Sequence, residues 1–238
     1  MNIDYEQLPW LNETATQFPT PSKALSNGLI AAGGNLSSEL ILSAYRQGIF
    51  PWFNVDSPIQ WWSPDPRMVL IPDQIKVSKS LKRTLKKKQY DVTVNKNFSA
   101  VILACSKPRI DQHEDGTSGW IHPEMINAYT KLHELGHAHS IECWQEDRLI
   151  GGLYGIAIGQ VFFGESMFSI APDSSKIALV TLCQQLQKWE VQLIDCQVYS
   201  DHLASMGALE IDRSIFIDTL NQLCPVNSVQ NSWQEIGK

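Results

Sequence analysis

Three apolar segments in the middle of the chain constrain its fold more than any other feature. They cover residues 139–144, 149–158 and 160–168, and only the short joints Gln145-Glu146-Asp147 and Gly159-Gln160 separate them. Their apolar pattern predicts strands, and joints of this length are typical of hairpins. The sequence therefore predicts a three-stranded meander at the centre of the chain.

Further helical and strand patterns flank this meander. The spacing predicts helices over 98–106, 123–135, 175–189 and 214–223, a basic helix over 78–88, and strands over 90–94 and 192–198. Pro123 suits a first helical position, and Gly136 suits a helix stop. A meander followed by a helix, a strand and a helix matches the order of N-acetyltransferase folds, although many α+β domains share it. We expect an α+β fold whose larger, N-acetyltransferase-like domain has a mainly antiparallel central sheet.

The first 65 residues have a different character, rich in turn formers, Trp and Pro. A short helix is expected between Asn35 and Gly48, with Ser37 or Ser38 as its cap. The stretch 51–72 is aromatic and proline-punctuated, and its prolines exclude a regular helix there. We interpret it as an ordered crossing, which predicts a small N-terminal domain over 1–65 and a catalytic domain over 66–238.

The composition favours a cytoplasmic globular protein. No apolar run approaches the roughly 20 residues that span a bilayer, so no membrane association is expected. Residues 1–10 carry acids but no Lys or Arg, unlike the start of a signal peptide. The five cysteines are widely separated and form no C-x-x-C pair, which favours reduced thiols over disulfides or a zinc cluster.

One segment is strongly basic although the formal net charge of the chain is −6. Residues 76–88 hold seven of the nineteen Lys and Arg residues and no acid. Lys79, Lys82, Arg83 and Lys86 recur at i, i+3, i+4 and i+7, which makes one stripe on a helix. Such a stripe suits a phosphate backbone; the alternative is a solvated face.

Four motifs resemble those of one enzyme family. They are Gly48-Ile49-Phe50-Pro51-Trp52-Phe53; Trp61-Trp62-Ser63-Pro64-Asp65-Pro66-Arg67; Gly151-Gly152-Leu153-Tyr154-Gly155 continuing to Phe163-Gly164-Glu165-Ser166-Met167-Phe168-Ser169; and Leu193-Ile194-Asp195-Cys196-Gln197. In order and spacing they resemble leucyl/phenylalanyl-tRNA–protein transferases. The resemblance runs from about residue 18 to about residue 233.

The resemblance implies both a reaction and its partners. Leu or Phe, and Met less well, would move from aminoacyl-tRNA to the α-amino group of proteins with N-terminal Arg or Lys, which marks them for N-end-rule degradation. The implied partners are leucyl-tRNA, phenylalanyl-tRNA and those acceptor proteins. The resemblance also implies a monomer, with no metal and no nucleotide cofactor.

Asp195 and Gln197 are the candidate catalytic residues. The donor ester is already activated, so the reaction mainly needs positioning, amine deprotonation and stabilisation of an oxyanion. Alternation on one strand directs both side chains to one face, where the carboxylate could polarise the amide toward an incoming amine. The resemblance places this pair at the site of peptide-bond formation. Proton relay and simple holding of the acceptor both stay open, and so does a hydrogen-bonded pair that merely ends a strand.

Further site residues follow from the resemblance and from burial. Glu165 lies among apolar and small residues, where a carboxylate needs a cation; the N-terminal Arg or Lys of the acceptor would supply one, or else an internal Arg. The aminoacyl-adenosine pocket would be lined by apolar and aromatic residues, namely Trp52, Leu153, Phe162, Phe168, Leu179 and Ile194. The alternative for each of these is core packing. Leu153 replaces a Met of some relatives, so the side-chain preference can differ.

Two competing classes rest on single features. A CoA-dependent N-acetyltransferase usually has a Gly-rich pyrophosphate loop before a helix, whereas the segment before Ser175 is Ile170-Ala171-Pro172-Asp173. Residues 133–137 match H-E-x-x-H, a zinc protease signature that needs both histidines on one helix. We expect the helix to end at Gly136, which would place His137 off the face of His133.

Overall fold

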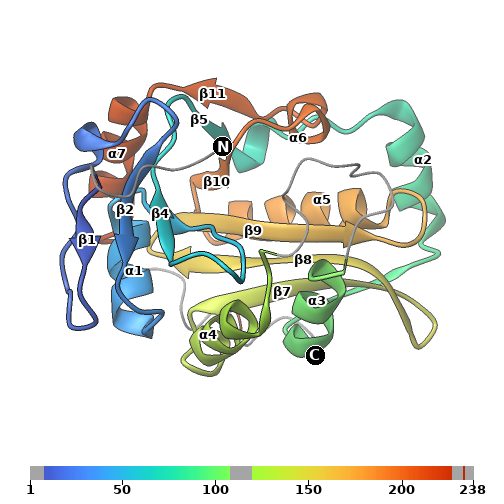
Figure 1. The fold of residues 1–238 in the computed structure, drawn as a ribbon. Helices are drawn as coiled ribbons and strands as arrows, with labels where there is room; N and C mark the ends of the chain where they lie inside the picture. The colour runs from blue at the N-terminus through green and yellow to red at the C-terminus, as the bar shows by residue number, and fades with distance from the viewer. Residues whose placement is uncertain (1–7, 108–119, 227–232, 234–238) are drawn as a thin grey trace.

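The computed structural model describes residues 8–107, 120–226 and 233 (Figure 1). The strands are β1 (Trp10–Leu11), β2 (Leu29–Gly33), β3 (Phe50–Pro51), β4 (Gln60–Trp62), β5 (Arg67–Leu70), β6 (Asp91–Val94), β7 (Ala138–Gln145), β8 (Arg148–Ile158), β9 (Val161–Ser169), β10 (Leu193–Gln197) and β11 (Leu209–Ile211). The helices are α1 (Ser38–Arg46), α2 (Lys79–Lys87), α3 (Phe98–Cys105), α4 (Pro123–Glu134), α5 (Ser174–Lys188), α6 (Asp201–Ser205) and α7 (Arg213–Leu223), with 3₁₀ turns at Pro21–Lys23 and Pro72–Gln74.

The larger sheet contains the meander that the sequence predicts. Its seven strands lie in the order β11-β5-β10-β9-β8-β7-β6, and β7, β8 and β9 pair as successive antiparallel neighbours. Only β9 and β10 run parallel, because α5 carries the chain across the sheet between them. The expected α+β fold with a mainly antiparallel sheet is confirmed.

Helices cover both faces of this sheet, as Figure 1 shows. Neighbouring residues on β8 point to opposite faces, so Leu153 joins the core under α5 while Tyr154 joins the core under α3 and α4. Ser78 caps α2 and Ser37 caps α1, each by accepting a backbone N–H three residues on. No helix within the described ranges is long and apolar enough to cross a bilayer.

A small N-terminal unit packs on the α3 and α4 side. Its four strands pair in the order β1-β2-β4-β3, and Trp61 of β4 is fully buried and donates its indole N–H to the carbonyl of Gly33. One apolar core joins this unit to the larger sheet, since Tyr45 of α1 and Phe163 of β9 stack edge to face at 5.1 Å. Residues 51–72 are ordered, as expected, but they also contribute β4 to one sheet and β5 to the other.

Candidate active site

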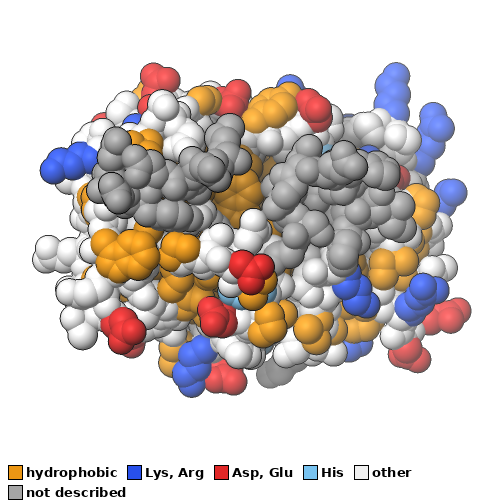
Figure 2. Space-filling model, viewed as in Figure 1, with side chains coloured by type: hydrophobic (Ala, Val, Ile, Leu, Met, Phe, Trp, Pro, Cys, Tyr) orange, Lys and Arg blue, Asp and Glu red, His pale blue; other side chains and the backbone are white. Residues whose placement is uncertain are grey.

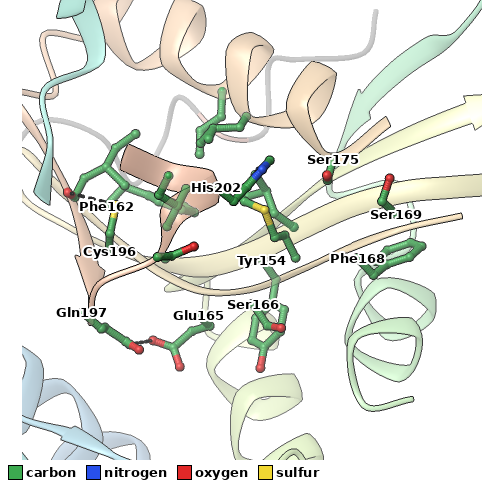
Figure 3. Close-up of a pocket in the computed structure, with 18 of the residues that line it drawn as sticks. Tyr154, Phe162, Glu165, Ser166, Phe168, Ser169, Ser175, Cys196, Gln197 and His202 are labelled. Carbon is green, nitrogen blue, oxygen red and sulfur yellow. Dashed lines mark hydrogen bonds between the residues drawn. The ribbon is translucent and has the colours of Figure 1, made fainter. Parts of the chain in front are cut away.

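A cavity of about 830 Å³ opens between α5, β9 and β10. Its origin is the short pairing of β10, which runs beside β9 only from Leu193 to Asp195. β9 continues to Ser169 without that neighbour, and beyond a bulge between Asp195 and Gln197 β10 pairs only with β5. The gap between the two strands is therefore lined by the second half of β9, the end of β10 and the apolar face of α5 (Figure 3).

The apolar wall of the cavity contains most of the residues that the family resemblance implies. Leu153, Phe162, Phe168, Leu179 and Ile194 all line it and are buried. Trp52 is not among the described lining residues. It is half-buried after β3, where it packs on Trp62 with ring centroids 5.7 Å apart and accepts that residue's indole N–H at 2.6 Å.

Asp195 forms a buried ion pair with Arg67 of β5. The Arg67 Nε and Nη2 atoms donate to the two carboxylate oxygens of Asp195 at 2.8 and 2.7 Å, and neither side chain is more than 1% exposed. The guanidinium lies between the rings of Phe50 and Phe216, 4.7 Å from each centroid, and also donates to the carbonyl of Gly48. The sequence shows Arg67 as part of a motif but does not reveal this pairing, because Asp195 is 128 residues away along the chain.

Gln197 is held by Asp195 in a way that simple alternation did not predict. At the bulge Gln197 adopts a positive φ of 64°, and its backbone N–H, not its side chain, donates to Asp195 Oδ1 at 2.9 Å. The side-chain amide donates instead to Glu165 Oε1 at 2.8 Å (Figure 3). The expected contact between the Asp195 carboxylate and the Gln197 amide is thus corrected: the carboxylate fixes the backbone that aims the amide.

Glu165 borders the cavity, which Asp195 also lines although its side chain is fully buried. Glu165 is half-buried on β9 and accepts the Tyr45 hydroxyl at 2.6 Å, and that hydroxyl is in turn hydrogen-bonded to the Tyr129 hydroxyl. Burial raises the pKa of Glu165 to about 7, against the opposing effect of the two tyrosine hydroxyls. The sequence left open an internal Arg as its alternative partner, but no ion pair between Glu165 and an Arg occurs among the described residues, and the buried Arg67 pairs with Asp195. Tyr45 and Tyr129 had no distinguishing signal in the sequence, where both fit apolar helix faces.

The basic stripe lies on an exposed helix, as predicted. Lys79, Lys82, Arg83 and Lys86 of α2 are all exposed, while Leu81 is buried beneath them. Figure 2 shows Lys and Arg side chains projecting from the edge of the molecule where α2 lies. None of the ion pairs among the described residues involves α2.

The H-E-x-x-H match does not form a metal site. α4 ends at Glu134, and Gly136 takes a positive φ of 79°, so His137 lies beyond the helix that carries His133. His133 stacks on Phe98 and its Nδ1 lies 2.8 Å from the carbonyl of Ala138. Over residues 8–107, 120–226 and 233, no three His, Cys, Asp or Glu side chains are grouped to hold a metal ion.

Two family models and several known relatives that match this chain share one description. The family model for leucyl/phenylalanyl-tRNA protein transferase matches residues 69–221, and the model for its N-terminal domain matches 34–65. A leucyl/phenylalanyl-tRNA–protein transferase of Nitrosomonas europaea is 56% identical over 92% of both chains, and one of Saccharophagus degradans is 50% identical over 95% of this chain and 96% of its own.

Similarity to solved structures is weaker. A GCN5-related N-acetyltransferase from Kribbella flavida aligns at 11% identity with a TM-score of 0.36, over 72% of this chain and 60% of that one. The class is set by the sequence relatives, which make the chain an aminoacyltransferase. The chain belongs to the leucyl/phenylalanyl-tRNA–protein transferase family.

Proposed function

We propose that this enzyme transfers Leu or Phe, and Met less well, from its tRNA to the α-amino group of proteins that begin with Arg or Lys. The products would be substrates of N-end-rule degradation, and the enzyme would act as a cytoplasmic monomer without a cofactor. The observation that carries the proposal is a single cavity with an apolar wall and a polar end formed by Glu165 and Gln197. The apolar side chain of the donor amino acid and the cationic N-terminus of the acceptor can both bind in this cavity.

The apolar wall suits the donor. Leu153, Phe162, Phe168, Leu179 and Ile194 offer contacts to an unbranched or γ-branched side chain but no hydrogen bond to a polar one. The cavity of about 830 Å³ lies within the range of small-molecule sites and has room for more than a side chain. We assign the remaining space to the terminal adenosine, and the family resemblance implies Trp52 as a further contact. Pockets of this kind discriminate modestly, by about 1–3 kcal/mol per methylene, which allows Met as a poor substrate.

The polar end suits the acceptor. Glu165 borders the cavity, forms no ion pair with a described residue, and would pair in its ionised form with the cationic N-terminal residue. The Gln197 amide, held by Asp195, lies beside that carboxylate and would contact the acceptor at the point of bond formation. The buried ion pair that already engages both Asp195 oxygens supports holding over proton relay.

The exposed stripe on α2 would bind the tRNA. Four cations face solvent on one side of the helix, and α2 packs against α5, which forms a wall of the cavity. A tRNA lying on α2 could therefore reach the cavity with its aminoacyl end. Phosphate contacts of this kind supply affinity without sequence recognition.

A direct transfer assay tests the function. The protein is incubated with leucyl-tRNA and a peptide that starts with Arg, and mass spectrometry should detect a Leu-Arg N-terminus. The same peptide with an acetylated N-terminus and one that starts with Asp are the matched controls. Replacing leucyl-tRNA by acetyl-CoA should give no product. Transfer to the Asp-starting peptide at an equal rate would refute the assigned acceptor, and no transfer from any charged tRNA would refute the function.

A further inference from the structure

The two carboxylates of the site differ in their ability to take up a proton. Asp195 is fully buried, and each of its oxygens already accepts a guanidinium N–H, one of them the Gln197 backbone N–H as well. Although Asp195 is among the residues that line the cavity, its carboxylate is 0% exposed, and each oxygen is already held by Arg67. Breaking such a buried ion pair typically costs several kcal/mol. Asp195 is therefore already engaged with Arg67 and with the Gln197 backbone before any substrate binds.

Glu165 has the opposite environment. It lines the cavity, and its hydrogen bonds come from neutral donors, the Tyr45 hydroxyl and the Gln197 amide. Burial raises the pKa of the Tyr45 hydroxyl well above 10, so that group stays a donor. The charged groups that influence Glu165 oppose each other, since Asp195 raises its pKa and Arg67 lowers it. Among the described residues, Tyr129 of α4 and Tyr154 of β8 are further titratable groups that interact with Glu165, and both are deeply buried and have raised pKa values.

We propose that Glu165 takes the proton from the acceptor amine, and that Arg67 holds Asp195 as a neutral ion pair whose task is to position Gln197. The inference rests on the proposed transfer reaction and assigns its proton. In this step the free amine attacks the ester carbonyl carbon and forms the C–N bond. Glu165 accepts the proton that the nitrogen loses, the C–O bond to the tRNA ribose breaks, and Glu165 returns the proton to the departing ribose oxygen.

The proton affinity of Glu165 fits this step. Its pKa of about 7 lies close to that of a peptide α-amine, about 7.7–8.0. A base with a pKa near the operating pH combines a useful ionised fraction with a strong enough pull on the proton. The Arg67–Asp195 pair adds almost no net charge beside Glu165. In addition, Asp195 Oδ1 accepts the Gln197 backbone N–H and so fixes the strained backbone at that residue. Arg67 is thus a positioning residue, and Glu165 the catalytic one.

The pH dependence of kcat tests the proposal. Transfer from saturating leucyl-tRNA to a saturating Arg-starting peptide is measured between pH 5.5 and 8.5 for the wild type, Glu165→Gln, and the double variant Arg67→Gln with Asp195→Asn. The double variant removes both charges together, so it leaves no unpaired buried ion. Glu39→Gln on the exposed face of α1 is the matched control for the loss of one carboxylate. The peptide amine itself titrates alike in all four.

The expected outcomes separate the two carboxylates. Wild type and Glu39→Gln should lose rate below about pH 7 as Glu165 becomes protonated. Glu165→Gln should lose about 10²–10⁴-fold in kcat at pH 7.5 and lack that protein-dependent decline. The double variant should be slower but keep the decline.

Three results would overturn the proposal. They are a Glu165→Gln variant that keeps its kcat and the wild-type pH profile, a Glu165→Gln effect confined to KM for the peptide, and a double variant that loses the decline while Glu165 is intact. Product formation by the wild type in the same assay keeps any of these distinct from a failure of the proposed function.

Discussion

Removing the stripe on α2 should weaken tRNA binding and also reduce its salt dependence, because phosphate contacts are lost. In the triple variant Lys79→Ala, Arg83→Ala, Lys86→Ala, three exposed cations disappear, none of which pairs with an acid among the described residues. Each lost phosphate contact reduces the slope of log K against log salt by about 0.9, so three reduce it by about 2.7. Between 50 and 200 mM salt, wild-type affinity should therefore fall about 40-fold more than that of the variant.

Charged-tRNA binding at several salt concentrations measures this slope. The matched control is Lys23→Ala, Lys131→Ala, Lys188→Ala, which removes the same charge from exposed positions outside α2. Its slope should stay close to that of the wild type. A small aminoacyl-adenosine donor should serve the stripe variant nearly as well as the wild type, because the cavity is untouched.

The comparison of the two triple variants decides the role of the stripe. If both slopes fall equally, net charge alone governs tRNA binding and the stripe has no special place. If the stripe variant keeps the wild-type slope, α2 is only a solvated helix face. If the stripe variant loses activity with the small aminoacyl-adenosine donor, the substitutions have disturbed the packing of α2 on α5 and not a tRNA contact.

Three other substitutions probe the core of the site and the fold. Arg67→Met should cost about 3–5 kcal/mol in urea unfolding, because it leaves Asp195 buried without its cation; a cost below about 1 kcal/mol would contradict a tight pair. His139→Phe should flatten acid destabilisation. Burial lowers the pKa of His139 from 6.5 to about 3, so only the unfolded chain binds its proton between these values, and the wild type should lose about 3 kcal/mol from pH 7 to pH 4 that the variant keeps. The urea midpoints of the wild type and of His139→Phe should change with pH in the same way above pH 7. Leu153→Phe should reduce kcat/KM for Phe transfer at least about 10-fold more than for Leu transfer, whereas Leu103→Phe on the exposed face of α3 should change neither.

The larger domain could be predicted well because its signals are local. Hairpin joints fixed the meander, and apolar spacing with Pro123 and Gly136 fixed the span of α4. The N-terminal strands were not predicted. They are two to five residues long, too short for alternation to show, and they are ordered by Trp61 and its neighbours instead of by a repeated pattern. The boundary between 65 and 66 stays a prediction.

The candidate site could be predicted in its members but not in its connections. Five of the six pocket residues meet at one cavity, because the strands and helix that carry them follow from local pattern. The hydrogen bonds that link Asp195, Gln197 and Glu165 depend on a bulge and on a positive φ at Gln197. The residue types in this segment do not predict either feature. A Gly or Asn there would have signalled such a backbone, whereas Gln is expected to stay extended.

The polar end of the cavity belongs to the whole chain and not to the larger sheet alone. Glu165 receives its hydroxyl from Tyr45 of α1, and Arg67 is enclosed by Phe50 of β3 and Phe216 of α7. A break in the N-terminal unit would expose the guanidinium to water and remove one donor from Glu165, so the ion pair would weaken and the carboxylate would lose its fixed direction. The aromatic and proline-rich segment before β5 can hold these parts in register because it places strands in both sheets. The family's small N-terminal domain is therefore a structural component of the polar end of the cavity, which it supports through the apolar core shared by the two sheets.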